Sequence, residues 1–410
     1  MVSRVLVLAT HLSRANAGAA HATIDIANTL AETEWADVTV HAYTRDEDAL
    51  SPAIRFVQGA ARPEPRLLWR VPSSYRIRHA VAELRGLGLP PADVCYTQST
   101  ELGLAYRLLH PATPIISHTG HVLVDRELLE ESGATPGPLL RLESRLQKRT
   151  ELRTYRAPRW THVVSTRLVA RQRERHYGLP EGFFEVRPLG VDGRRFDRAA
   201  DHPDVRATLG VPPDAFLVAT VARLVPWKGI DTLLRAVAAS RARPWLVVVG
   251  DGRDAPRLRA LAGELGVAER VRFVGHAHPA PYLAAADLFA LPSLIESFGM
   301  VYAEAMHLGL PCIGLRNDPP RVLSSAMDVI PEGVAGYCVS SQEELRERID
   351  QLAADAALRR RLGEQAHALA TREYSARRYC EFIRELVERE RTPSVAAAAR
   401  VSREPAPQLL

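Results

Sequence analysis

Short apolar runs alternate with segments of helical periodicity along most of the 410-residue chain. In the first half, apolar runs of strand length cover residues 5–8, 38–40, 93–96, 114–117 and 162–165. In the second half, such runs cover residues 216–221, 246–249, 271–274, 288–291 and 312–315. Most neighbouring runs are separated by stretches with helical spacing of apolar residues. Nearly continuous hydrophobic strands that alternate with helices predict parallel sheets covered on both faces, and therefore an α/β fold.

Two series of strands in succession favour two doubly wound domains, which agrees with about 150 residues per domain. The boundary is predicted at Pro188 and Gly190, where one strand ends and a poorly periodic stretch begins. We therefore expect one domain over residues 1–187 and a second over residues 188–373. Residues 391–410 are rich in Ala, Pro and Arg and lack a core pattern, so we expect a disordered tail.

Composition excludes several classes of protein. The chain is 46% hydrophobic and 25% charged, which is ordinary for a globular protein and not for a coiled coil or a disordered chain. The sequence lacks the run of about 18 uncharged apolar residues that a membrane span needs. The apolar run at the amino terminus is too short for a signal peptide, and the four cysteines form no CxxC pair. We therefore expect a cytoplasmic protein without a zinc site or a disulfide framework.

The basic residues are unusual in kind, because all but two of the 53 are arginine. The two lysines are Lys148 and Lys228. A lysine kept in such a background indicates a place where a compact ammonium is needed, although chance retention explains it equally well.

The segment 291–304 is the most informative for chemistry. It follows a buried strand and is predicted to open a helix near Ser297 or Phe298, where unpaired N–H groups would form an anion site. Glu296 precedes this helix, and Glu304 lies about two turns, or about 12 Å, further along the same side. The two carboxylates suit a nucleotide sugar, whose hydroxyls donate hydrogen bonds. The alternative is that Glu296 caps the helix and Glu304 is a surface carboxylate.

The segment 216–229 adds two cations. Arg223 and Lys228 lie five residues apart in a loop that follows a strand, and Gly229 opens the next helix. Ligands of open α/β sheets bind outside the carboxyl ends of the strands, so these cations are placed to clamp a diphosphate. An ordinary solvated loop is the alternative.

Together these two segments resemble the retaining glycosyltransferases of family 4, which have the GT-B fold. The resemblance implies an α/β chain of two Rossmann-like doubly wound domains that face a central cleft. Further motifs agree in order and spacing, at residues 249–252, 271–275, 285–287, 291–293 and 304–306. Gly190, Val191 and Asp192, followed by Phe196, are similar to the interdomain connection of the family. The resemblance is strong from about residue 186 to residue 340 and weak before it.

The resemblance implies roles in the second domain, which would bind the donor. Arg223 and Lys228 would bind the diphosphate and stabilise the departing nucleotide diphosphate. Glu296 would hold sugar hydroxyls, and Glu304 would bind the ribose hydroxyls. The remaining donor-binding candidates are Gly250 of the 249–252 motif, His276 beside the nucleobase, and the amides of Phe298, Gly299 and Met300.

In the first domain, which would bind the acceptor, the resemblance implies fewer residues. The Gly-Gly loop that the family usually has after the first strand keeps only Gly18 here. A histidine after a strand is typical of the family, and His118 matches that position, with His121 as the second choice. His118 would hydrogen-bond a sugar hydroxyl and help to balance charge. The last helix, at residues 375–389, is expected to pack back onto the first domain.

For a retaining transfer without an evident covalent nucleophile, the family's favoured account is attack from the front face. No essential metal ion and no other cofactor are expected. Asp46 and Asp48 form an Asp-x-Asp, the metal motif of the other glycosyltransferase architecture, but no donor motif surrounds them. We interpret them as part of a solvated loop.

Two clusters of basic residues indicate what kind of partner the first half of the chain could bind. Eleven basic residues lie within residues 141–176, against three glutamates, and Arg66, Arg70, Arg76, Arg78 and Arg85 form a second cluster. Such a face suits weak peripheral binding to an anionic membrane, a phosphorylated acceptor, or plain solvation. Nucleic-acid binding is not expected, because no reader motif or aromatic platform accompanies the charge.

The sequence therefore predicts a retaining, metal-independent hexosyltransferase. We expect a UDP-sugar donor first and a GDP-sugar next, and a small hydroxylated acceptor such as a cyclitol or a natural-product scaffold. The main alternative is a peripheral-membrane enzyme that acts on a lipid-linked or polysaccharide acceptor at the inner face of the plasma membrane. A catalytically silent sugar-nucleotide-binding homologue is a more remote alternative. A nucleotide-sugar epimerase does not predict the Arg223, Lys228, Glu296 and Glu304 set, and a starch-type synthase normally begins with a Lys-x-Gly-Gly loop.

Overall fold

The computed structural model describes residues 2–13, 18–60, 73–120, 148–197 and 204–391. The predicted tail beyond Arg391 lies outside this part of the chain, as do His121, Arg66, Arg70 and residues 141–147.

The first half of the chain forms a seven-stranded parallel sheet in the order β5-β3-β1-β6-β7-β8-β9. Its strands are β1 (Ser3–Leu8), β3 (Ala36–Ala42), β5 (Arg55–Gln58), β6 (Val94–Thr97), β7 (Ile115–Thr119), β8 (Trp160–Val164) and β9 (Glu185–Val186). The helices of this half are α1 (Gly18–Ala31), α3 (Ser73–Gly86), α4 (Thr100–Leu109) and α7 (Arg167–Tyr177). Two short strands, β2 (His11–Leu12) and β4 (Thr44–Arg45), pair beside the sheet.

The second half forms a six-stranded parallel sheet in the order β12-β11-β10-β13-β15-β17. Its strands are β10 (Leu217–Val221), β11 (Trp245–Val249), β12 (Val271–Gly275), β13 (Leu288–Leu291), β15 (Cys312–Leu315) and β17 (Gly336–Val339). Its longer helices are α10 (Ile230–Ala239), α11 (Ala255–Glu264), α13 (Met300–His307), α15 (Gln342–Ala354) and α16 (Ala356–Glu373). Shorter elements are α9 (Val205–Leu209), α12 (Ala280–Ala284), α14 (Ala326–Val329), the 3-10 turns η2 (Pro226–Lys228) and η3 (Ala268–Arg270), and the pair β14 (Ile295–Glu296) and β16 (Leu323–Ser324).

The predicted α/β architecture with two parallel sheets is confirmed, and each apolar run that was predicted to be a strand overlaps a strand of one of these sheets. The helix predicted to open at Gly229 is α10, which begins at Ile230. Among the described strands of the two large sheets, β5 and β17 were missed, and the two-residue strands β2, β4, β14 and β16 were missed as well. The edge strand β5 is half-exposed and has polar ends, and β17 begins at a glycine whose φ is +146°. Neither presents a run of four apolar residues, so the pattern that found the other strands overlooks them.

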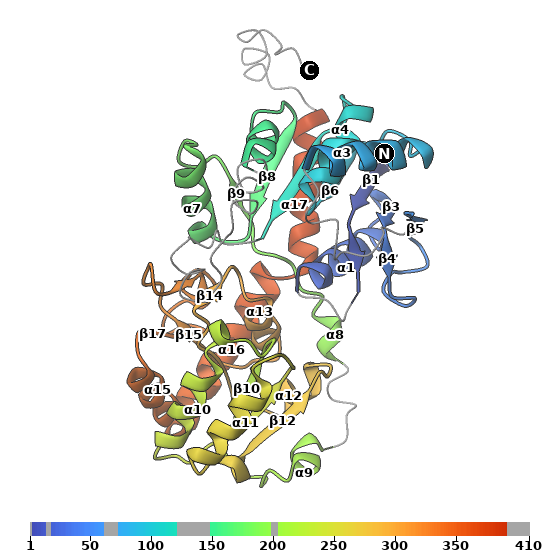
Figure 1. The fold of residues 1–410 in the computed structure, drawn as a ribbon. Coiled ribbons are helices and arrows are strands. Elements are labelled where there is room, and N and C mark those ends of the chain that lie inside the picture. The colour runs from blue at the N-terminus through green and yellow to red at the C-terminus, as the bar shows by residue number, and fades with distance from the viewer. Residues whose placement is uncertain (1, 14–17, 61–72, 121–147, 198–203, 392–410) are drawn as a thin grey trace.

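The last helix, α17 (Ala376–Arg391), returns to the first half of the chain and packs against α1 (Figure 1). Phe382, Ile383 and Leu386 lie in one buried cluster with Val5, Val7 and other residues of the first sheet. Burial of a large apolar side chain contributes about 1.5 to 3 kcal/mol, so these contacts hold the carboxyl-terminal end of the chain on the first sheet.

The chain therefore crosses between the two halves twice, and the crossings lie side by side. The Val191 amide donates to the carbonyl of Tyr374, and the Ala376 amide donates to the carbonyl of Val191. A Cβ atom on Gly190 would lie 2.5 Å from the Cα of Ala376, so the two backbones approach as closely as only glycine allows. The short segment α8 (Arg194–Asp197) follows the first crossing.

Candidate active site

Lys228 and Glu296, which the sequence places 68 positions apart, form an ion pair in the structure. The distance from Lys228 Nζ to Glu296 Oε2 is 2.7 Å, and the side chains are 19% and 11% exposed. Lys228 follows β10 and Glu296 follows β13, and these strands are neighbours in the second sheet. The carboxyl ends of adjacent parallel strands meet at one edge, which brings the two side chains together.

The loops that carry this pair are held by close backbone contact. Gly229 has φ of +66°, and a Cβ atom there would lie 2.0 Å from the carbonyl oxygen of Pro292. The Leu294 amide donates to the carbonyl of Trp227 over 2.8 Å. Only glycine combines this φ with this approach, so Gly229 fixes the position of Lys228 relative to Glu296.

The helix after Glu296 begins later than the sequence suggested. The prediction put its start near Ser297 or Phe298, whereas α13 begins at Met300. The physical reason is Gly299, whose φ of +72° is left-handed and ends the preceding loop. The amide groups of residues 298–300 therefore lie at the amino terminus of an eight-residue helix, where the helix dipole favours an anion.

Gly18 at the start of α1 lies directly opposite this helix start. A Cβ atom on Gly18 would lie 2.9 Å from Cγ of Met300. The amino termini of α1, from the first half, and α13, from the second half, therefore meet at one place. Both helix dipoles direct their positive ends there.

Arg223 is exposed, and its guanidinium lies 5.9 Å from the centroid of the Trp227 ring. The Arg253 guanidinium lies 5.6 Å from the centroid of the same ring, so two cations lie close to this indole. Sequence reasoning missed Arg253, although its place directly after the 249–252 motif was a usable signal. Among the described residues, neither guanidinium has an ion-pair partner.

Gly250 and His276 lie together at the end of β11 and β12. Gly250 has φ of +127°, and its amide donates to the carbonyl of Gly275, the residue before His276. A Cβ atom at Gly250 would lie 1.9 Å from the carbonyl oxygen of Ala222, so the backbone here runs against the strand that leads to Arg223. The His276 side chain is exposed.

Glu304 is buried, at 5% exposure, on the second turn of α13. Burial raises the pKa of Glu304 from 4.5 to about 7, with the positive charge of Arg195 opposing the shift and Asp25 adding to it. Arg195 comes from α8 and forms an ion pair of 2.8 Å with Asp25 of α1. Sequence reasoning missed Asp25 and Arg195. The only acidic residue within the apolar α1 was the signal available for Asp25.

His118 at the end of β7 is 2% exposed, and both ring nitrogens have partners. Nδ1 lies 2.7 Å from the hydroxyl of Tyr379 on α17, and Nε2 lies 2.9 Å from Oγ of Ser165. The next residue, Thr166, donates to the carbonyl of Ser297 and lies 2.9 Å from Oγ of Ser325. Ser165 and Thr166 therefore connect the ring of His118 to the loop that carries Glu296.

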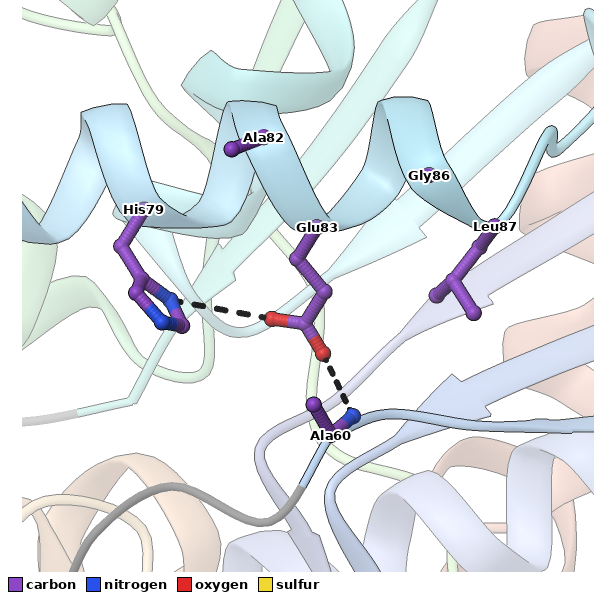
Figure 2. Close-up of a pocket in the computed structure, with 6 residues that line it drawn as sticks. All are labelled: Ala60, His79, Ala82, Glu83, Gly86 and Leu87. Carbon is purple, nitrogen blue, oxygen red and sulfur yellow. Dashed lines mark hydrogen bonds and ion pairs between the residues drawn. The ribbon is translucent and has the colours of Figure 1, made fainter.

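A separate cavity of about 350 Å³ lies along α3. Figure 2 shows Glu83 at its wall, where one carboxylate oxygen accepts a hydrogen bond from the Ala60 amide over 2.9 Å and the other lies 4.0 Å from His79. None of the site residues predicted from the sequence lines this cavity.

Asp46 and Asp48 lie exposed in the turn after β4. Across the described ranges, no group of three or more His, Cys, Asp or Glu side chains is arranged to hold a metal ion. None of the described helices is both long and apolar enough to cross a membrane.

Comparison with known proteins finds a family model that matches part of the second half of the chain. Residues 201–368 match the family model described as glycosyl transferases group 1. The chain is 35% identical over 173 residues to the lipopolysaccharide core biosynthesis glycosyltransferase LpsE of Rhizobium meliloti, covering 42% of this chain and 49% of that protein. It is 36% identical over 250 residues to the D-inositol 3-phosphate glycosyltransferase of Mycolicibacterium gilvum, covering 57% and 51%. The matches thus span about half the length of these curated relatives.

Among solved structures, the Anabaena protein Alr3699/HepE in complex with UDP-glucose has a TM-score of 0.69. The match covers 94% of this chain and 99% of that protein at 20% sequence identity. This likeness confirms the GT-B fold, and the family match confirms the resemblance to group 1 glycosyltransferases.

The buried carboxyl of Glu304 predicts a pH-dependent stability. Between pH 4.5 and pH 7 this carboxyl is protonated in the folded protein but ionised in the unfolded chain. The folded state then binds more protons, so its stability falls as pH rises through this window, by about 3 kcal/mol at 1.4 kcal/mol per pKa unit. Glu304→Gln keeps the shape and removes the titration. We expect urea denaturation to show the variant gaining stability over the wild type by about that amount from pH 4.5 to pH 8.

Glu264→Gln, at an exposed position of α11, is the control for the loss of one carboxylate. A difference between Glu304→Gln and wild type that is the same at both pH values would contradict the assignment.

Proposed function

We propose that this chain, whose residues 201–368 belong to the glycosyl transferases group 1, is a retaining glycosyltransferase. It moves a sugar from a nucleotide-diphosphate sugar, a UDP-sugar first and a GDP-sugar second, to a hydroxyl of a small acceptor such as a cyclitol. The observation that carries the proposal is the 2.7 Å contact between Lys228 and Glu296 at the carboxyl ends of neighbouring strands. An ammonium beside a carboxylate at this edge offers partners for both parts of the donor, its diphosphate and its sugar.

Lys228 and Arg223 bind the diphosphate of the donor. The bond from the anomeric carbon to the phosphate oxygen breaks during transfer, and negative charge develops on the departing nucleotide diphosphate. Two cations and the amino terminus of α13 lie around the place where this charge develops, which lowers the barrier electrostatically. The start of α1 at Gly18 adds a second helix dipole from the opposite side.

Glu296 binds the sugar of the donor. One of its oxygens contacts Lys228, and the other can accept hydrogen bonds from sugar hydroxyls. The amides of Phe298, Gly299 and Met300 lie beside it. In a front-face retaining transfer, the acceptor oxygen bonds to the anomeric carbon on the side from which the phosphate departs. The acceptor proton passes to the leaving phosphate oxygen, so no metal ion is required by this route.

Glu304 accepts hydrogen bonds from the ribose, and Gly250 and His276 line the nucleobase. The buried carboxyl of Glu304 has no hydrogen-bond partner among the described residues, and Arg195 provides the positive charge that favours its ionised form. His118 contacts the sugar from the first half of the chain. The D-inositol 3-phosphate glycosyltransferase among the relatives supports a cyclitol as the acceptor.

Thermal unfolding of the purified protein with UDP, GDP, ADP and dTDP, each with and without magnesium, tests the donor site. A nucleotide at 100 times its Kd adds about 2.7 kcal/mol of stability, which raises Tm by several degrees. We expect UDP to give the largest shift, without magnesium, and Lys228→Ala to abolish it.

Lys148→Ala is the matched control, because it changes the only other lysine, which donates to the carbonyl of His176. This variant should keep the full shift. If none of the four nucleotides shifts Tm, the donor site is misassigned. Activity of Lys228→Ala equal to that of wild type would overturn the role of Lys228 alone.

A second candidate is the peripheral-membrane enzyme, and the surface of α7 favours it. Arg167, Arg171 and Arg175 are exposed and spaced four residues apart, so they lie on one face of the helix. Two acidic residues nearby are buried, since Glu151 pairs with Arg173 and Glu174 accepts from the Phe183 amide, whereas the exposed Asp328 accepts from the Leu168 amide at the first turn. The exposed face is therefore cationic, and LpsE among the relatives is named for lipopolysaccharide core biosynthesis.

Vesicle flotation separates the two candidates. If the acceptor is membrane-borne, the wild type floats with vesicles containing anionic lipid but not with neutral ones, at about 1 kcal/mol per well-placed charge. Replacing the three α7 arginines by glutamine should then abolish flotation. The control replaces Arg235, Arg360 and Arg361, exposed on α10 and α16 of the second half, and removes the same charge. If the wild type does not float at low salt, the membrane candidate is wrong and the proposal of a small acceptor stands.

A further inference from the structure

The short strand β14, which carries Glu296, lies between the two halves of the chain. Its first residue, Ile295, packs against an apolar cluster of the first half that includes Val164 and Val169. Its second residue, Glu296, forms the ion pair with Lys228 of the second half. Successive side chains of a strand point to opposite sides, so β14 presents one side chain to each half.

Thr166, which lies between β8 and α7 of the first half, bonds to the loop that follows β14. Its hydroxyl donates to the carbonyl of Ser297 over 3.1 Å and lies 2.9 Å from the hydroxyl of Ser325. The Ser325 amide donates in turn to the carbonyl of Glu296 over 2.9 Å. Thr166 and Ser325 are both buried. The carbonyls of Glu296 and Ser297 are therefore both held, each by a residue from a different half.

A second bond attaches the same part of the first half to the second half. The Leu168 amide, in the first turn of α7, donates to the carboxylate of Asp328 on α14 over 2.8 Å. Since a carbonyl only accepts, the Thr166 proton goes to Ser297, and the Ser325 hydroxyl donates to the Thr166 oxygen. The start of α7 is thus fixed against the second half directly beside the loop that carries Glu296.

We propose that Thr166 is a positioning residue for Glu296, which couples the joining of the two halves to the placement of this carboxylate. Thr166 and Ser297 come from different halves, so their bond exists only while the halves are together. A group that holds a reacting sugar must be placed to within about 0.5 Å, which a fixed backbone on both sides provides. The inference rests on the proposed function for the role of Glu296, and it adds a requirement for the first half in placing a residue of the donor site.

Thr166→Val tests the proposal, because valine keeps the shape of threonine and removes its hydroxyl. Amide hydrogen exchange of the full chain, measured by mass spectrometry, reports on the peptide that covers residues 294–300. We expect exchange in this peptide to become faster by roughly tenfold or more in Thr166→Val, because the donor to the Ser297 carbonyl is lost. Thr166→Ser keeps the hydroxyl and should exchange at nearly the wild-type rate.

Two control variants separate this effect from a general loss of stability. Thr113→Val removes another buried hydroxyl of the first half, which donates to the Ala92 carbonyl over 3.1 Å. Thr166 also caps α7 by accepting from the Val169 amide, so Ser99→Ala, which removes the cap of α4, controls for the loss of a cap. Neither control should change the exchange of residues 294–300.

Ser325→Ala keeps the test available if Thr166→Val does not fold. It removes the hydroxyl that orients Thr166 and should give a smaller increase in the exchange of the same peptide. Unchanged exchange of residues 294–300 in the folded variants of Thr166 and Ser325 overturns the proposal. An equal increase in Thr113→Val or Ser99→Ala also overturns it.

Kinetics separate this inference from the proposed function. Thr166→Val should lower kcat by roughly tenfold or more and leave the Kd of the nucleotide within about twofold, and Thr166→Ser should restore kcat. A wild type that transfers no sugar, together with faster exchange in Thr166→Val, overturns the proposed function and not the coupling. Full activity in a Thr166→Val variant whose loop exchanges faster overturns the role of Thr166 in placing Glu296.

Discussion

The contact between the Lys228 ammonium and the Glu296 carboxylate exists because two loops of the second sheet are pressed together. Gly229 lies against the carbonyl of Pro292 at a distance that excludes any side chain, and the backbone bond from Leu294 to Trp227 fixes the register of the two loops. The ion pair is only partly exposed, so solvent screens it less than a surface pair. Lys228 and Glu296 take their relative positions from this junction.

The second constraint is the way the first half of the chain is joined to this junction. Thr166 bonds the Ser297 carbonyl, Arg195 pairs with Asp25 of α1, and Gly18 lies against Met300. The return of α17 to the first sheet supplies Tyr379 to His118. Residues from both halves therefore reach the same place, which the proposed transfer between a donor and an acceptor requires.

Much of this could be predicted from the sequence, because it depends on local patterns. Apolar runs identified most strands, and the ordered motifs pointed to the second half of the chain as the part similar to known glycosyltransferases. The pattern overlooked β5, which has polar ends, and β17, which begins at a glycine. It also placed the start of α13 too early, because it did not foresee the left-handed Gly299. Asp25, Arg195 and Tyr379 acquire their significance only from partners far away in the chain, and a single sequence carries no sign of those pairings.

The most direct test of the central claim is a crystal structure of the full chain with UDP. The account predicts that the diphosphate lies within hydrogen-bond distance of Lys228 Nζ and the amide groups at the start of α13, with the ribose hydroxyls on Glu304. A nucleotide bound elsewhere, such as along the arginines of α7 or in the cavity beside Glu83, would contradict the account.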